Sequence, residues 1–131
     1  MAEKKIILAI DDDPVALSVF TSLLTADYDL RISKSAADAE ILMEKVKPDV
    51  ILLDIEMPDI SGFEFLHTIK KDPRFMFLPV VIVTGHHEPA LVEYAEKGGA
   101  DAVVPKPVTG EDLFRAINEA LLKPRVSIFG L

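Results

Sequence analysis

The chain has 131 residues and no cysteine, half of its residues are hydrophobic, and its formal net charge at pH 7 is -8. This length and composition suit one domain with a core of its own, and the lack of cysteine excludes disulfides, thiolate metal sites and cysteine nucleophiles. The acidic balance argues against binding of a nucleic-acid backbone by this domain, because no Lys/Arg cluster offsets it, so we expect its partners to be other proteins.

The first half of the chain predicts two strands, each followed by a helix. The continuous apolar run at 6–10 is typical of a strand buried on both faces of a parallel sheet, and a weaker strand is expected at 28–32. Asp13 is the expected cap of the first helix, with Pro14 at its first position, and the second helix is expected to begin near Ser35. The residues expected to face inward are Ala16, Phe20, Leu23 and Leu24 on the first helix, and Ala39, Leu42, Met43 and Val46 on the second.

The second half predicts three more strands, at 50–53, 79–83 and 102–105, with a helix after each. Ser61 is the expected cap of the third helix, and the fifth helix is expected to begin near Thr109. Pro89 opens the fourth helix, and Gly98 and Gly99 close it with a glycine able to take positive φ. The residues expected to face inward are Phe63, Leu66 and Ile69 on the third helix, and Leu113, Phe114, Ile117 and Leu121 on the fifth.

Alternating strands and helices predict an α/β fold with a single, doubly wound, five-stranded parallel sheet, because parallel crossovers are right-handed and place helices on both faces. Pro105 has no amide hydrogen to donate, so the fifth strand is expected at an edge of the sheet. We expect one domain over 1–122 and, at 123–131, a tail or linker stub that is either a docking segment or the start of a linker. No apolar run approaches the ~20 residues of a membrane span and no signal peptide is evident, so we expect a cytoplasmic protein that does not contact membranes.

Polar residues stand where the apolar runs end. They are Asp11, Asp12, Asp54, Thr84 and Lys106. The carboxyl ends of parallel strands meet at one edge of a sheet, where ligands bind in open α/β folds. Three carboxylates, a hydroxyl and an ammonium gathered at this edge suit a divalent cation and a phosphoryl group.

The three aspartates allow two interpretations. Carboxylates about 4 Å apart repel by up to about 4 kcal/mol per pair at an effective dielectric of about 20, so a cluster of Asp11, Asp12 and Asp54 takes up protons or binds a cation. Oxygen ligands that leave room for water favour Mg²⁺. Alternatively, the acidic run 11–13 is a helix cap with first-turn acids, an interpretation that we adopt for Asp13.

Asp54 ends the most apolar run of the chain, where a carboxylate is costly unless it has a partner. It is either a nucleophile that takes a phosphoryl group or a cap for the loop at 56–59. Lys106 could reach both Asp54 and a phosphate oxygen, or be a solvated lysine in a turn. The Thr84 hydroxyl could donate to a phosphoryl oxygen, or Thr84 could simply be a residue with high strand propensity. The joint placement of these residues at the strand ends favours the functional interpretation.

The chain resembles the response regulator receiver domains of two-component signalling systems, which include chemotaxis regulators, over residues 4–122. The motifs that carry this resemblance are the pair Asp11–Asp12, the stretch from Asp54 to Gly62 with Met57–Pro58, the pair Thr84–Gly85, and the pair Lys106–Pro107. The resemblance implies a flavodoxin-like (βα)5 fold with the strand order 2-1-3-4-5. It also implies the function of a phosphorelay switch.

The resemblance implies that Asp54 accepts a phosphoryl group from a phosphohistidine on a sensor histidine kinase or a phosphotransfer protein. Asp12 then binds Mg²⁺ directly, Asp11 binds it largely through water, and the backbone carbonyl of Glu56 is a further ligand. The protein is expected to signal by contact with an unknown downstream protein. Its only catalysis is expected to be its own phosphorylation and dephosphorylation, so it is not an enzyme in the ordinary sense.

In this family Thr84 and Lys106 are expected to contact the phosphoryl oxygens, and the Lys106–Pro107 bond is expected to be cis. Many members carry Tyr or Phe where this chain has Val103, so we expect any switch at this face to work without a large aromatic movement, through the loop at 85–88. His86 is expected to modulate dephosphorylation and not to bind zinc, because the nearby oxygen cluster prefers a hard metal.

Two other functions stay open at this stage. A Mg²⁺-dependent phosphatase with an aspartyl nucleophile usually has a second aspartate where this chain has Glu56, and it needs a cap domain. A scaffold receiver would work without phosphorylation, although all five key residues are present. Charged residues on the fourth and fifth helices suit either a homodimer, through the face formed by helix four, strand five and helix five, or a solvated surface. These residues are Glu93, Glu96, Lys97, Glu111 and Arg115.

Overall fold

The computed structural model describes residues 3–123, in which five strands alternate with five helices. The strands are β1 (Ile6–Ile10), β2 (Asp29–Ser33), β3 (Val50–Leu53), β4 (Val80–Thr84) and β5 (Ala102–Pro105). The helices are α1 (Pro14–Leu24), α2 (Ala36–Lys45), α3 (Gly62–Lys71), α4 (Pro89–Lys97) and α5 (Gly110–Leu122). The predicted elements are therefore all present, with two strands shifted by one residue.

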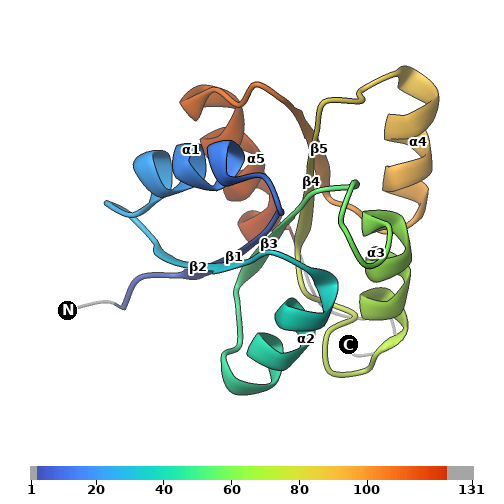
Figure 1. The fold of residues 1–131 in the computed structure, drawn as a ribbon, viewed down its shortest axis with the longest axis horizontal. Helices are drawn as coiled ribbons and strands as arrows, with labels where there is room; N and C mark the ends of the chain where they lie inside the picture. The colour runs from blue at the N-terminus through green and yellow to red at the C-terminus, as the bar shows by residue number, and fades with distance from the viewer. Residues whose placement is uncertain (1–2, 124–131) are drawn as a thin grey trace.

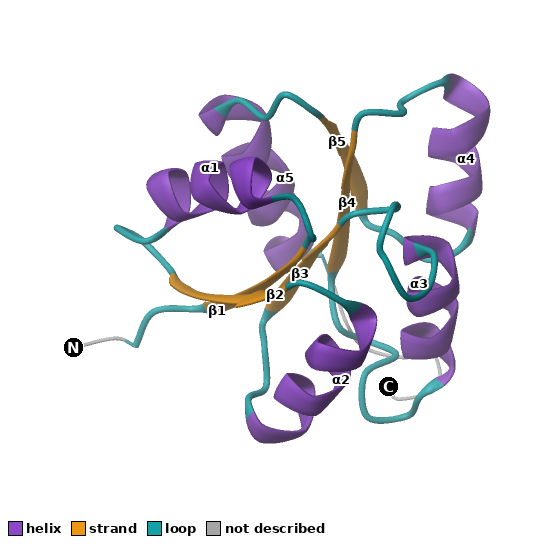
Figure 2. Cartoon of the chain, in the orientation of Figure 1, coloured by secondary structure: helices purple, strands orange, loops and turns teal. Residues whose placement is uncertain are grey.

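The strands form one parallel sheet in the order β2-β1-β3-β4-β5. Helices α1 and α5 cover one face of the sheet, and α2, α3 and α4 cover the other (Figures 1 and 2). The predicted doubly wound sheet and its strand order are confirmed. Strand β5 lies at the edge of the sheet with Pro105 as its last residue, as the missing amide hydrogen of proline requires.

Side chains of successive strand residues enter two separate apolar clusters. In β1, Ile7 and Ala9 join the cluster under α1 and α5, whereas Leu8 and Ile10 join the cluster under α2, α3 and α4. This alternation is the period of two that a strand imposes, and with both faces covered every position of β1 is apolar. Each such side chain removed from water contributes about 1.5–3 kcal/mol.

Each of the four helices with predicted inward residues leaves at least one of them only partly buried: Leu23 in α1, Leu42 in α2, Phe63 in α3, and Phe114 and Leu121 in α5. In α1 Leu17 is buried with Phe20 and Leu24, while Leu23 is only partly buried. In α3 Phe65 is 1% exposed, whereas Phe63 is partly buried. The Phe63 ring packs edge-on against Tyr94 of α4, with 4.8 Å between ring centroids.

The predicted helix caps are confirmed by hydrogen bonds. The side chains of Asp13, Ser35, Ser61 and Thr109 each accept from a backbone amide in the first turn of the helix that follows. Gly99, after α4, has φ of 105°, a conformation that glycine adopts without a Cβ penalty.

The described domain ends with α5 and Lys123, and most of the predicted tail, residues 124–131, lies outside the described residues. Among the described residues, no helix combines the length and the apolar character needed to cross a membrane.

Candidate functional site

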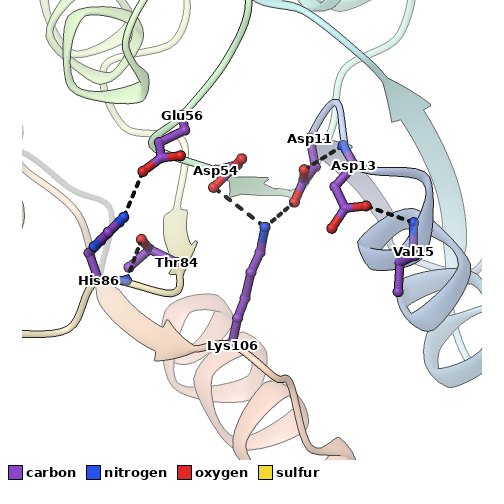
Figure 3. A network of polar contacts seen from close by, with 8 residues as sticks. All are labelled: Asp11, Asp13, Val15, Asp54, Glu56, Thr84, His86 and Lys106. Carbon is purple, nitrogen blue, oxygen red and sulfur yellow. Dashed lines mark hydrogen bonds and ion pairs between the residues drawn. The ribbon is translucent and has the colours of Figure 1, made fainter.

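A pocket of about 420 Å³ opens at the carboxyl edge of the sheet, where the predicted polar residues come together. The loops that follow β1, β3, β4 and β5 all contribute to it, and Figure 3 shows the polar contacts among their side chains. The residues that line it are Asp12, Asp13, Asp54, Glu56, Met57, Pro58, Thr84, Gly85, His86 and Lys106. Asp11 lies beneath this lining, with 0% of its surface exposed.

Three carboxylates are gathered at this site, as predicted. One oxygen of each of Asp11, Asp12 and Asp54 lies within 4.8 Å of the other two. Asp11 and Asp54 are buried, and Asp12 is exposed. The burial of Asp54 raises its pKa to about 6, the charge of Asp11 adds to this, and Lys106 and the backbone amide of Glu56 act against it.

Lys106 lies between the two buried carboxylates (Figure 3). Its Nζ donates to Oδ2 of Asp11 at 2.8 Å and lies 3.5 Å from Oδ1 of Asp54. Burial lowers the pKa of Lys106, but the hydrogen bond to Asp11 and the charges of Asp11 and Asp54 outweigh it, and the pKa is raised. The closer partner is thus Asp11 and not Asp54, which the sequence pattern did not predict. The Lys106–Pro107 peptide bond is cis, as expected.

Thr84 is buried at the end of β4, and its hydroxyl oxygen accepts a hydrogen bond from the backbone N–H of His86 at 3.0 Å. The His86 ring turns toward Glu56, with 2.6 Å between Nε2 and Oε1, so these two side chains meet at the rim of the pocket (Figure 3). Sequence analysis placed His86 near the site but missed its contact with Glu56. Thirty residues separate the two, and no local pattern pairs them.

The turn after β3 is closed by Gly62, whose N–H donates to the carbonyl oxygen of Ile55 at 2.6 Å. A Cβ at this position would overlap the carbonyl oxygen of Asp54 and lie 2.7 Å from the Cα of Ile55. Only glycine therefore allows α3 to begin this close to the backbone of Asp54.

A sequence model of the response regulator receiver domain matches residues 7–118. The chain belongs to this family. The receiver domain is 32% identical to Protein PilH of Pseudomonas aeruginosa over 116 residues, which cover 88% of this chain and 96% of PilH. The match explains why the four motifs occur in this order and at these strand ends.

Solved structures agree with this assignment. A CheY-like receiver domain protein from Methanospirillum hungatei has a TM-score of 0.81 and 30% identity, and the match covers 91% of this chain and 94% of that one. The Mn²⁺-bound form of the response regulator Rcp1 has a TM-score of 0.74 and 25% identity, with 86% and 88% of the two chains covered. The chain is accordingly a receiver domain of the kind found in two-component response regulators.

Proposed function

We propose that this receiver domain accepts a phosphoryl group on the carboxylate of Asp54 and signals by contact with a downstream protein. The observation that supports this proposal most strongly is the Lys106 ammonium, 3.5 Å from a buried Asp54 carboxylate that faces the pocket. An ammonium at this distance offsets charge on the phosphoryl oxygens as they approach. The donor that we propose is a phosphohistidine on a sensor histidine kinase or a phosphotransfer protein.

In the proposed transfer an Asp54 oxygen attacks the phosphorus of the donor. A new O–P bond forms, the P–N bond breaks, and its electron pair returns to the imidazole of the donor, which takes up a proton. Lys106 and the hydroxyl of Thr84 are the groups that would contact the phosphoryl oxygens. There is open space next to Thr84 for a phosphoryl group. A Cβ added at the neighbouring Gly85 would meet no atom within 4 Å.

The carboxylate cluster fits a hard divalent cation, since it offers oxygen ligands only and has an open side. We propose that Asp11, Asp12, Asp54 and the backbone carbonyl of Glu56 hold Mg²⁺. Both Asp11 oxygens already accept hydrogen bonds, from Lys106 and from the Asp13 amide, which supports an indirect role through water. The response regulator Rcp1 has a Mn²⁺-bound form, which is consistent with the proposal that this chain binds a divalent metal. When bound, the ion supplies positive charge opposite the phosphoryl oxygens.

The experiment that tests this function is incubation with acetyl phosphate and Mg²⁺, followed by measurement of the intact mass. We expect one added phosphoryl group that is labile to hydroxylamine and absent from Asp54→Asn. Asp12→Asn is expected to slow the reaction. Its matched control is Asp13→Asn, which removes the same charge from the side chain that caps α1 at the rim of the pocket and is expected to slow the reaction less.

The other outcomes of this experiment are decisive. Multiple turnover of small phosphate esters would favour the phosphatase, and an unchanged mass with every phosphodonor would favour the scaffold.

We also propose the α4–β5–α5 face as a candidate surface for a homodimer. On that face Lys97 pairs with Glu93 at 2.9 Å and Arg115 with Glu111 at 2.8 Å. Each of these ion pairs lies within a single helix, so the charges suit a solvated surface as well.

A further inference from the structure

Asp59, in the loop between β3 and α3, makes contacts that the phosphorylation chemistry does not use. Its Oδ1 accepts a hydrogen bond from the N–H of Ala36 at 3.1 Å, and its Oδ2 accepts one from the N–H of Ala37 at 2.9 Å. These are the first two residues of α2, and helix-terminal amides such as these have no partner within the helix. One carboxylate therefore caps a helix that begins more than twenty residues earlier in the chain.

The α2 terminus has a cap of its own as well. Ser35 precedes the helix, and its Oγ accepts from the N–H of Asp38 at 3.1 Å. The backbone N–H of Ala37, followed by that of Ala36, lowers the pKa of Asp59, so the carboxylate is charged at neutral pH. Ser35 thus supplies the local cap, and Asp59 adds a second connection that ties α2 to a distant loop.

That loop forms one wall of the pocket. Glu56, Met57 and Pro58 line the pocket and directly precede Asp59. The two ends of the loop are joined by the hydrogen bond from the Gly62 N–H to the Ile55 carbonyl oxygen. Two described side chains of this loop bond to other parts of the chain: that of Glu56 meets His86 in the loop after β4, and that of Asp59 accepts from the first turn of α2.

We propose that Asp59 is a positioning residue, which fastens the pocket wall formed by residues 56–58 to α2 and thereby sets the affinity of the site for a divalent cation. This inference rests on the proposed function, because the Glu56 carbonyl is one of the proposed ligands. Without Asp59 the loop loses two hydrogen bonds to α2. The Glu56 carbonyl is then less well fixed before the ion binds, and ordering it costs part of the binding free energy. Loss of such an outer contact weakens metal binding even though the residue touches no metal.

The test compares Asp59→Ala with Ser35→Ala, since both remove a cap of α2 but only the first releases the loop. Mg²⁺ binding to the unphosphorylated protein is measured by calorimetry, and the rate with acetyl phosphate is measured against Mg²⁺ concentration. For Asp59→Ala we expect about a 10-fold weaker Mg²⁺ affinity and the same maximal rate at saturating Mg²⁺. For Ser35→Ala we expect unchanged affinity.

Asp59→Asn keeps one carbonyl acceptor and is expected to restore part of the Mg²⁺ affinity, and it serves as the test variant should Asp59→Ala fail to fold. Amide hydrogen exchange at Ala36 and Ala37 reports the lost bonds independently. Equal effects of Asp59→Ala and Ser35→Ala on Mg²⁺ affinity would overturn the proposal, as would a wild type that binds no Mg²⁺. A wild type that binds Mg²⁺ but takes no phosphoryl group would overturn the proposed function alone.

Discussion

The Asp54 carboxylate is held in a balance between opposing electrostatic effects. Burial and the charge of Asp11 favour its protonated form, and Lys106 favours the ionised form. Because the Lys106 hydrogen bond goes to Asp11, the ammonium only partly offsets the burial of Asp54, whose pKa stays near 6. Carboxylates whose pKa is shifted by burial and by specific charged neighbours are common at functional sites.

Gly62 gives a prediction at the same scale. Gly62→Ala places a methyl group against the backbone of Asp54 and Ile55, so we expect it to destabilise the fold by about 2 kcal/mol and to slow phosphorylation. Urea unfolding and the intact-mass assay measure the two effects.

The control for Gly62→Ala is Gly85→Ala, a change of the same size at the rim of the same pocket. A Cβ at Gly85 meets nothing within 4 Å, so the free energy of unfolding should be unchanged. Equal destabilisation by both substitutions would contradict the packing argument.

The sequence predicted which residues meet at the site but not how they pair. Asp54, Thr84 and Lys106 each follow an apolar run, and parallel strands bring such positions to one edge. The Lys106 Nζ lies 2.8 Å from Asp11 and 3.5 Å from Asp54, a difference that no spacing rule contains. The bonds from Asp59 to α2 also escaped prediction, because Asp59 and the start of α2 are 23 residues apart and no local pattern pairs them.

At the scale of the elements, the order, type and caps of helices and strands followed from local patterns. The inward face was harder to predict. Phe63 and Phe65 are equally apolar and two positions apart, yet Phe65 enters the core and Phe63 packs against Tyr94 of α4. Hydrophobic periodicity defines a stripe, whereas the exact residue depends on the neighbouring helix.

The loop between β4 and α4 is the element that we expect to move on activation. The Thr84 hydroxyl oxygen now accepts from the His86 amide, and a contact with a phosphoryl oxygen would compete with that bond. Helix α4 follows directly and Glu88 gives it no side-chain cap, so its first turn is free to follow. Val103, which is partly buried against the same apolar cluster as Leu91, has no ring to reorient.

Amide chemical shifts with and without beryllofluoride and Mg²⁺ test this prediction. We expect the largest changes at 84–91 and small ones in the middle of α1. An unmoved Thr84 loop in structures of the two states would contradict it.

At the scale of the whole molecule, Asp54 ties stability to pH. Its pKa is about 6 in the folded protein, against an ordinary value of 3.8, so the folded state binds more protons between these two pH values. The ionised form of Asp54 therefore destabilises the fold. The free energy of unfolding decreases as the pH rises through about 6 and stays lower above that pH.

Asp54→Asn removes this cost. In the absence of metal we expect the variant to be more stable than the wild type by about 3 kcal/mol near pH 7.5 and equally stable near pH 4. Urea unfolding at both pH values measures the difference. Mg²⁺ should reduce it at the higher pH, because the ion stabilises only the protein that binds it. Equal stability of the two proteins at pH 7.5 would argue against a costly carboxylate.

The sheet divides the interior into two apolar layers that have no residue in common. The acidic pocket touches them only where the strands end. Substitutions in the helices on one face of the sheet can therefore change which partner is recognised. The apolar cluster on the other face and the residues of the pocket need not change with them. Diversity among descendants is then expected to concentrate on helix exteriors.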